Sequence, residues 1–162
     1  MIVVADSSPL NYLVLIDEVD LLPALFGEVL IPQAVFQELK HPKTPAKVQQ
    51  WISRLPAWLE VRTVASAPAL AAPGPALMKL DIGEREAIQL ALELGISTVL
   101  LDETDGRREA ENLHLEVRGT LGILERGARL GKIDFRQALG KLEQSNFRMS
   151  PAIKAAFLKR NP

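Results

Sequence analysis

Short apolar runs alternate with longer amphipathic stretches along this chain. Continuous apolar runs predict buried strands at residues 1–4, 29–31, 97–101 and 115–117, and alternation at 59–64 predicts a half-exposed strand at a sheet edge. Helices are predicted at 9–15, 19–26, 33–39, 48–55, 84–94, 105–113, 120–130, 135–144 and 151–159. Apolar residues spaced by three and four mark those at 48–55 and 84–94, whereas the helix at 105–113 is polar. This order predicts an α/β fold with three α/β/α layers around a central parallel sheet of four or five strands.

Residues with strong local preferences mark the ends of the predicted elements. Ser8 followed by Pro9 is typical of a helix start, with Ser8 as the N-cap. Asp81 is a candidate N-cap for the helix at 84–94, and Gly95 ends that helix. Residues 65–76 consist mostly of alanine and proline, which predicts a surface loop within one domain that spans the whole chain, 1–162.

The composition narrows the chemistry that the chain can perform. There is no cysteine and there are only two histidines, so disulfides and thiolate or histidine-rich metal sites are excluded. A metal site would use oxygen ligands, which favours Mg²⁺ or Mn²⁺ over zinc. The net charge of −1 provides no global attraction for nucleic acid, so a basic patch would have to be local. We expect a cytoplasmic protein without a membrane anchor, because the sequence shows no signal peptide and no apolar run near ~20 residues.

Two acidic residues directly follow predicted strands. Asp6 comes after the first strand and Asp102 after the strand at 97–101. Because the carboxyl ends of parallel strands meet at one edge of the sheet, where open α/β sheets place their sites, we expect these two carboxylates to converge. The alternative for Asp6 is that it only helps to cap a helix. Asp105 is either the N-cap of the helix at 105–113 or a rival for the role of Asp102.

Two glutamates on predicted helices are further candidates. By helical spacing Glu84 points the same way as Ala87 and Ile88, toward the core, and a carboxylate directed there needs a cationic partner. The alternative is that Glu84 lies in an exposed first turn, where acids are common. Glu86 points toward solvent. Glu38 lies at the margin of the core stripe of the helix at 33–39, so spacing alone leaves its role open.

A cluster of three or four such carboxylates would repel itself unless positive charge is supplied. Two divalent cations about 3.5–4 Å apart remove this repulsion and can activate a water in phosphodiester cleavage. The sequence contains no Walker motif, no GxGxxG and no GxSxG that would support a competing chemistry. The residue pattern therefore favours a carboxylate metal site for phosphodiester hydrolysis.

An ordered set of segments resembles the PIN-domain nucleases, and most closely the branch described as DUF3368, which is often grouped with VapC-type toxins. The segments are Asp6-Ser-Ser-Pro-Leu, Ile31-Pro followed by Glu38, Leu80-Asp-Ile-Gly-Glu-Arg-Glu-Ala-Ile88, Leu101-Asp-Glu-Thr-Asp-Gly-Arg-Arg108 and Val117-Arg-Gly-Thr-Leu-Gly-Ile-Leu124. The resemblance extends to about residue 133, and the helices from about residue 134 are less diagnostic.

The resemblance implies a PIN-like parallel-sheet fold and Mg²⁺- or Mn²⁺-dependent cleavage of RNA. The family's acids map onto Asp6, Glu38, Glu84 and Asp102, as catalytic residues and metal ligands. The Gly-Glu-x-Glu segment departs from many VapC-type toxins and resembles flap endonucleases, which leaves the role of Glu86 open. Asp105 also stays open, because family strands often end in threonine with an aspartate two residues later.

Two functional hypotheses follow. In the first, the protein is a metal-dependent endoribonuclease, the toxin of a toxin–antitoxin pair, with an RNA substrate, an antitoxin partner and a homodimeric assembly implied by the resemblance. In the second, it is a catalytically inactive PIN-like module that binds RNA or protein; the near-zero net charge favours this alternative slightly. Arg107 and Arg108 either meet the phosphate backbone or form a solvated helix face with Glu111. Apolar helices such as 48–55 and 153–157 either form a dimer face or belong to the core.

Overall fold

The structure, a computed structural model, describes residues 1–65 and 75–162; most of the predicted loop at 65–76 lies outside these ranges. The strands are β1 (Ile2–Ala5), β2 (Glu28–Pro32), β3 (Leu59–Arg62), β4 (Thr98–Leu100) and β5 (Glu116–Arg118). The helices are α1 (Ser7–Leu15), α2 (Leu21–Phe26), α3 (Gln33–Leu39), α4 (Ala46–Ile52), α5 (Pro75–Met78), α6 (Ile82–Leu94), α7 (Thr104–Asn112), α8 (Thr120–Arg129), α9 (Phe135–Glu143) and α10 (Pro151–Arg160).

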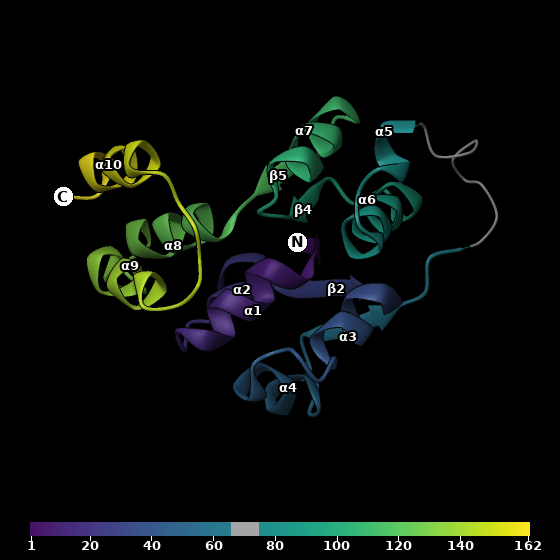
Figure 1. The fold of residues 1–162 in the computed structure, drawn as a ribbon, viewed down its shortest axis with the longest axis horizontal. Coiled ribbons are helices and arrows are strands. Elements are labelled where there is room, and N and C mark those ends of the chain that lie inside the picture. Colours follow the sequence, from purple (N-terminus) through teal and green to yellow (C-terminus); the bar gives the residue numbers. More distant parts are fainter. Residues whose placement is uncertain (66–74) are drawn as a thin grey trace.

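The five strands form one parallel sheet in the order β3-β2-β1-β4-β5. The chain winds outward from β1 to β2 and β3, and then crosses back to place β4 on the other side of β1 (Figure 1). This reversal between β1 and β4 creates the topological switch point at which open α/β sheets bind ligands. The predicted parallel sheet is confirmed, and β3 lies at an edge as its alternating pattern indicated.

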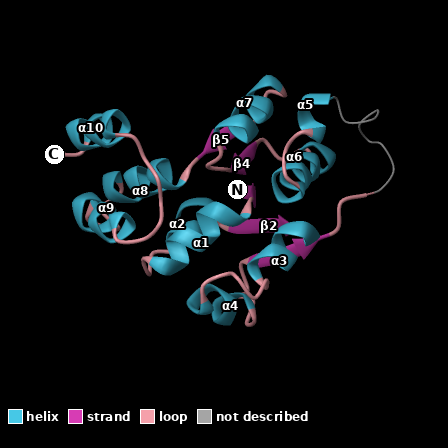
Figure 2. Cartoon of the chain, in the orientation of Figure 1, coloured by secondary structure: helices cyan, strands magenta, loops and turns pink. Residues whose placement is uncertain are grey.

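Both faces of the sheet are buried, as the continuous apolar runs require. Val3 and Ala5 of β1 belong to the larger core, which α1, α2, α8 and α9 help to enclose. Val4, between them, belongs to a second core formed with α5, α6 and α7 on the opposite face. Figure 2 shows the helices on the two sides of the strands, so the predicted three-layer arrangement is confirmed.

Several predicted helix boundaries are wrong by a few residues. Asp6, and not Ser8, occupies the N-cap position of α1, although its side chain makes no capping hydrogen bond, and Pro9 is the third helical residue. Glu103, and not Asp105, precedes the first residue of α7. The capping role of Asp81 is confirmed, because its Oδ1 accepts a hydrogen bond of 2.8 Å from the main-chain N–H of Glu84.

The C-terminal helices pack together beside the larger core (green to yellow in Figure 1). The Phe157 ring of α10 stacks on Phe135 of α9 with 6.1 Å between ring centroids. Arg160 and Asn161 both donate hydrogen bonds to Oε2 of Glu125 on α8, at 3.0 and 2.8 Å. Burial opposes ionisation of Glu125, but these hydrogen bonds outweigh it and hold the pKa of its carboxyl below the usual value. None of the described helices has the length and apolar character that crossing a membrane requires.

A candidate carboxylate site at the switch point of the sheet

Asp6 lies at the centre of the candidate site. It follows β1 directly, and its main-chain N–H donates to the carbonyl of Leu100 in β4 at 2.9 Å, which places it at the switch point. The residue is only 4% exposed, and its Oδ1 is buried without a hydrogen-bond partner among the residues that the structure describes. A buried, unpaired carboxylate oxygen is costly, so it marks a position where a cation or a proton is needed.

Glu38 and Asp81 approach Asp6 around Gly83, the second residue of α6. A methyl group placed on Gly83 would lie 3.3 Å from both Asp6 Oδ1 and Glu38 Oε2, and 3.5 Å from Asp81 Oδ1. Three carboxylates from different elements therefore border one small space that the absent side chain leaves open. The sequence predicted only a capping role for Asp81. Its proximity to Asp6 was missed, because the capping pattern already accounted for an acid at this position.

The electrostatics of this group favour protons or cations over free negative charge. Burial raises the pKa of Asp6 to about 8 from 3.8; the main-chain N–H of Ser7 opposes this rise, and the charges of Glu38, Asp81 and Asp102 add to it. Burial and a hydrogen bond with Asp81 likewise raise the pKa of Glu84 to about 9. Mutual repulsion of this kind is relieved when a divalent cation binds.

Glu84 is directed toward the start of α7. It is 6% exposed, which confirms that it points into the protein and not into an exposed first turn. Its Oε2 would lie 2.8 Å from a methyl group on Gly106, so any side chain at that position of α7 would displace the Glu84 carboxylate. Its negative neighbours include Asp81, Asp6 and Glu103. Glu84 thus shares the carboxylate site with Asp6 through electrostatic interactions.

Asp102 is bound to the start of α8. Its Oδ1 accepts a 2.7 Å hydrogen bond from the main-chain N–H of Thr120, and its Oδ2 accepts a 2.6 Å bond from the Thr120 hydroxyl. Burial raises the pKa of Asp102, while Thr120 and the guanidinium of Arg107 oppose this rise. Gly119 is the N-cap of α8, and Thr120, the first helical residue, is the partner of Asp102.

Gly119 makes the close approach of these groups possible. A methyl group on Gly119 would lie 2.5 Å from Arg107 Nη1 and 3.0 Å from Asp102 Oδ1, which is too close for both. The missing side chain therefore lets the Arg107 guanidinium lie over the Gly119 backbone next to the Asp102 carboxylate. This arrangement brings one positive charge to the edge of an otherwise acidic site.

The two acids whose roles were open lie in other environments. Glu86 accepts a hydrogen bond of 3.2 Å from the main-chain N–H of Ala34 in the first turn of α3, where a carboxylate is also favoured by the helix dipole. The Asp105 side chain is 75% exposed and forms an ion pair with Arg108 at 3.7 Å. Glu86 therefore ties α3 to α6, and Asp105 belongs to the solvated face of α7.

The predicted acids surround the switch point without forming a compact cage. Within residues 1–65 and 75–162, no three acidic or histidine side chains are arranged closely enough to hold a metal ion. Asp6 and Glu38 border the same space at Gly83, whereas both oxygens of Asp102 are hydrogen-bonded to Thr120. The unpaired oxygen of Asp6, the open space at Gly83 and the all-oxygen donor set fit a hard divalent cation.

The structure is thus a three-layer α/β/α protein with a parallel sheet and carboxylates at its switch point. The chain belongs to the PIN domain family DUF3368, because the model of that family, described as a PIN domain, matches residues 2–161. Members of PIN domain families are in general nucleases that use divalent metal ions. No curated protein and no solved structure matches the chain.

Proposed function

We propose that this protein is a Mg²⁺- or Mn²⁺-dependent endoribonuclease that hydrolyses phosphodiester bonds of RNA. The observation that carries the proposal is the buried Oδ1 of Asp6, which has no partner in the described structure and lies with Glu38 at the open space beside Gly83. The membership of the PIN domain family supports a nuclease. Asp6 and Glu38 would be the main ligands of the cation, and Asp81 borders the same space beside Gly83.

The remaining residues have distinct roles in this proposal. When bound, a divalent cation supplies charge stabilisation to phosphate oxygens and promotes the ionisation of water. Glu84, with a pKa of about 9, carries a proton on its carboxyl at neutral pH and releases it when positive charge arrives nearby. Asp102, oriented by Thr120 through both oxygens, adds negative charge at a defined position. Arg107 beside it supplies a positive charge for a phosphate.

Cleavage of a fluorescent RNA oligonucleotide tests the proposal. The wild-type protein should cleave in Mg²⁺ or Mn²⁺ and not in EDTA, and Asp6→Asn should abolish cleavage while the circular dichroism spectrum is kept. Asp105→Asn is the matched control, because it removes an exposed carboxylate of the same sheet edge that has no place in the site. Mn²⁺ should raise the melting temperature of the control and not of Asp6→Asn.

The same experiment separates the nuclease from an inactive PIN-like module. An inactive module would bind RNA without cleaving it, and its melting temperature would not change when Mn²⁺ is added. Cleavage by Asp6→Asn at the wild-type rate would contradict the proposed role of Asp6.

We also propose that the protein acts as a toxin that an antitoxin protein restrains, and that it works as a homodimer. The support for this role is the membership of the PIN domain family DUF3368, whose branch the sequence segments group with VapC-type toxins. Induced expression in a bacterial host should stop growth for the wild type and for Asp105→Asn, and not for Asp6→Asn. Normal growth of cells that contain active nuclease would contradict the toxin role, and sedimentation velocity would test the dimer.

A further inference from the structure

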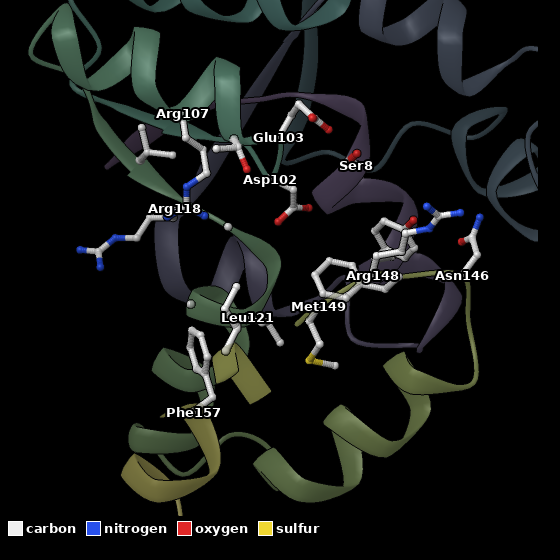
Figure 3. Close-up of a pocket in the computed structure, with 17 residues that line it drawn as sticks. Ser8, Asp102, Glu103, Arg107, Arg118, Leu121, Asn146, Arg148, Met149 and Phe157 are labelled. Atoms are coloured by element: carbon white, nitrogen blue, oxygen red, sulfur yellow. The ribbon is translucent and has the colours of Figure 1, made fainter. Parts of the chain in front are cut away.

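A groove of about 770 Å³ extends from Asp102 to the C-terminal segment (Figure 3). This volume lies within the ~300–1,000 Å³ typical of ligand sites. Four parts of the chain line the groove: the start of α1, the turn from β4 into α7, the turn from β5 into α8, and the C-terminal segment at 146–157. One end of the groove therefore belongs to the carboxylate site, and the other end is formed by residues that lie outside it.

Three arginines line the groove and provide the local positive charge that the whole chain lacks. They come from α7, from β5 and from the segment before α10: Arg107, Arg118 and Arg148. Among the described residues neither Arg107 nor Arg148 has an ionic partner within 4 Å, and Arg118 forms an exposed pair with Glu116 at 2.8 Å. Exposed pairs contribute little energy, so this pair does not prevent Arg118 from binding another anion.

The same groove has an apolar wall. It consists of Met149, Ile153 and Phe157 of the C-terminal segment together with Val117 and Leu121. Ile153 is 46% exposed although it is a large apolar residue, and α10 has no buried residue at all. Figure 3 shows Met149 and Phe157 on one side of the groove and the Asp102 carboxylate directed into it. Positive groups and apolar side chains thus line the same groove.

The C-terminal segment is held in place by a small number of contacts. Glu125 receives Arg160 and Asn161, and Lys154 pairs with Glu143 of α9 at 2.8 Å. The Phe147 ring meets Tyr12 of α1 edge to face, with 4.9 Å between the ring centroids. These contacts position Arg148 and Met149 between α1 and α10, so the far wall of the groove is built by residues that follow α9.

We infer that this groove binds a stretch of single-stranded RNA adjacent to the bond that is cut, with Arg107, Arg118 and Arg148 on its phosphates and the wall of Met149, Ile153 and Phe157 against its bases. This inference rests on the proposed nuclease function and adds a substrate-binding role for the C-terminal segment. A duplex shields its bases by stacking and pairing, whereas a single strand exposes them to apolar side chains. An acidic peptide such as polyglutamate fits less well, because it has no planar bases to cover the apolar wall of Met149, Ile153 and Phe157.

Fluorescence anisotropy with a labelled oligouridylate tests the inference independently of cleavage. The full-length protein carries Asp6→Asn, so that the RNA stays intact, and the affinity is measured over a series of salt concentrations. Arg148→Gln should weaken binding roughly tenfold and lower the slope of log Kd against log salt by about 0.7, the value for one lost phosphate contact on a single strand. Ile153→Ser should weaken binding without changing that slope, because it removes apolar contact and no charge.

Arg54→Gln is the matched control, since Arg54 is exposed and does not line the groove. Thermal melting of each variant identifies loss of folding. The inference is overturned if Arg148→Gln and Arg54→Gln bind RNA equally, if a duplex of the same length binds as tightly as the single strand, or if a polyglutamate peptide of equal charge binds more tightly. If Arg148→Gln leaves both RNA affinity and cleavage unchanged, the RNA-binding role of the groove is wrong and the nuclease function stands. If the protein binds RNA in the groove but shows no metal-dependent cleavage, the nuclease function is wrong and the RNA-binding role stands.

Discussion

Asp102 uses both of its carboxylate oxygens to bind a single residue, Thr120, which lies at the start of the next helix after β5. The main-chain N–H and the side-chain hydroxyl of Thr120 donate at 2.7 and 2.6 Å. The end of β4 is therefore tied directly to the start of α8. Glu125 of α8 also binds Arg160 of α10, and α10 forms part of the groove wall. The position of the groove therefore depends on the Asp102–Thr120 pair.

Removal of the Thr120 hydroxyl should disturb both stability and catalysis. Thr120→Ala leaves Asp102 Oδ2 without its donor in a partly buried position, and a hydrogen bond to a charged group contributes about 1.5–3 kcal/mol. We expect a loss of stability of this order in urea unfolding and a lower rate of RNA cleavage. Thr120→Ser keeps the donor and should retain both, so equal behaviour of the alanine and serine variants would contradict the role of the hydroxyl.

The stability of the metal-free protein should fall as the pH rises from about 5 to about 9. Asp6 and Glu84 have pKa values raised to about 8 and about 9, so the folded state binds protons that the unfolded state has already released. The stabilisation is complete below pH 4 and is lost as the pH passes through the raised values. Differential scanning fluorimetry in EDTA measures this decline.

The decline should depend on Asp6 and on the metal. Asp6→Asn should flatten it, Asp105→Asn should leave it unchanged, and Mn²⁺ should raise the melting temperature most at high pH, where protons no longer compete for the carboxylates. A melting temperature that rises between pH 5 and pH 9 in EDTA would show that the burial of these acids does not govern stability.

Gly83→Ala should weaken metal binding without harming the fold. The added methyl group would lie 3.3 Å from Asp6 Oδ1 and from Glu38 Oε2, so it fills the space between the carboxylates. Alanine is favoured over glycine in helices by about 1 kcal/mol, which offsets the crowding. Isothermal titration with Mn²⁺ should show a higher Kd. Gly140→Ala, in α9 with no atom within 4 Å of the new methyl group, is the control and should bind Mn²⁺ as the wild type does.

Glu86 and Glu84 should behave differently although only one residue separates them. Glu86→Ala removes the acceptor for the N–H of Ala34, and a lost helix cap costs about 1 kcal/mol, so stability should fall while metal-dependent cleavage is retained. Glu84→Gln should keep the stability and reduce cleavage and Mn²⁺ binding. Chemical denaturation and the cleavage assay together check the pair, and loss of cleavage in a folded Glu86→Ala protein would assign Glu86 to the site.

Local sequence signals were sufficient for several parts of the structure. The apolar runs predicted the strands because a strand buried on both faces has no room for polar residues, and the placement of Asp6 after β1 followed from the length of the first run. The capping role of Asp81 and the end of α6 at Gly95 depend on residues within one helical turn, so they were also predictable. The start of α1 was missed by two residues, because the helix begins directly after Asp6.

The sequence by itself determined the parallel sheet, the position of each acid at a strand or helix end and the oxygen-rich character of any metal site, because these depend on neighbours in the chain. Only the tertiary structure decided that Thr120 binds Asp102, that Glu86 caps a helix 52 residues away, and that Asp81 shares the space at Gly83 with Asp6. Such contacts join segments that are far apart in sequence. These contacts are determined by how whole helices pack against the sheet, so they cannot be predicted from the spacing of residues along the chain.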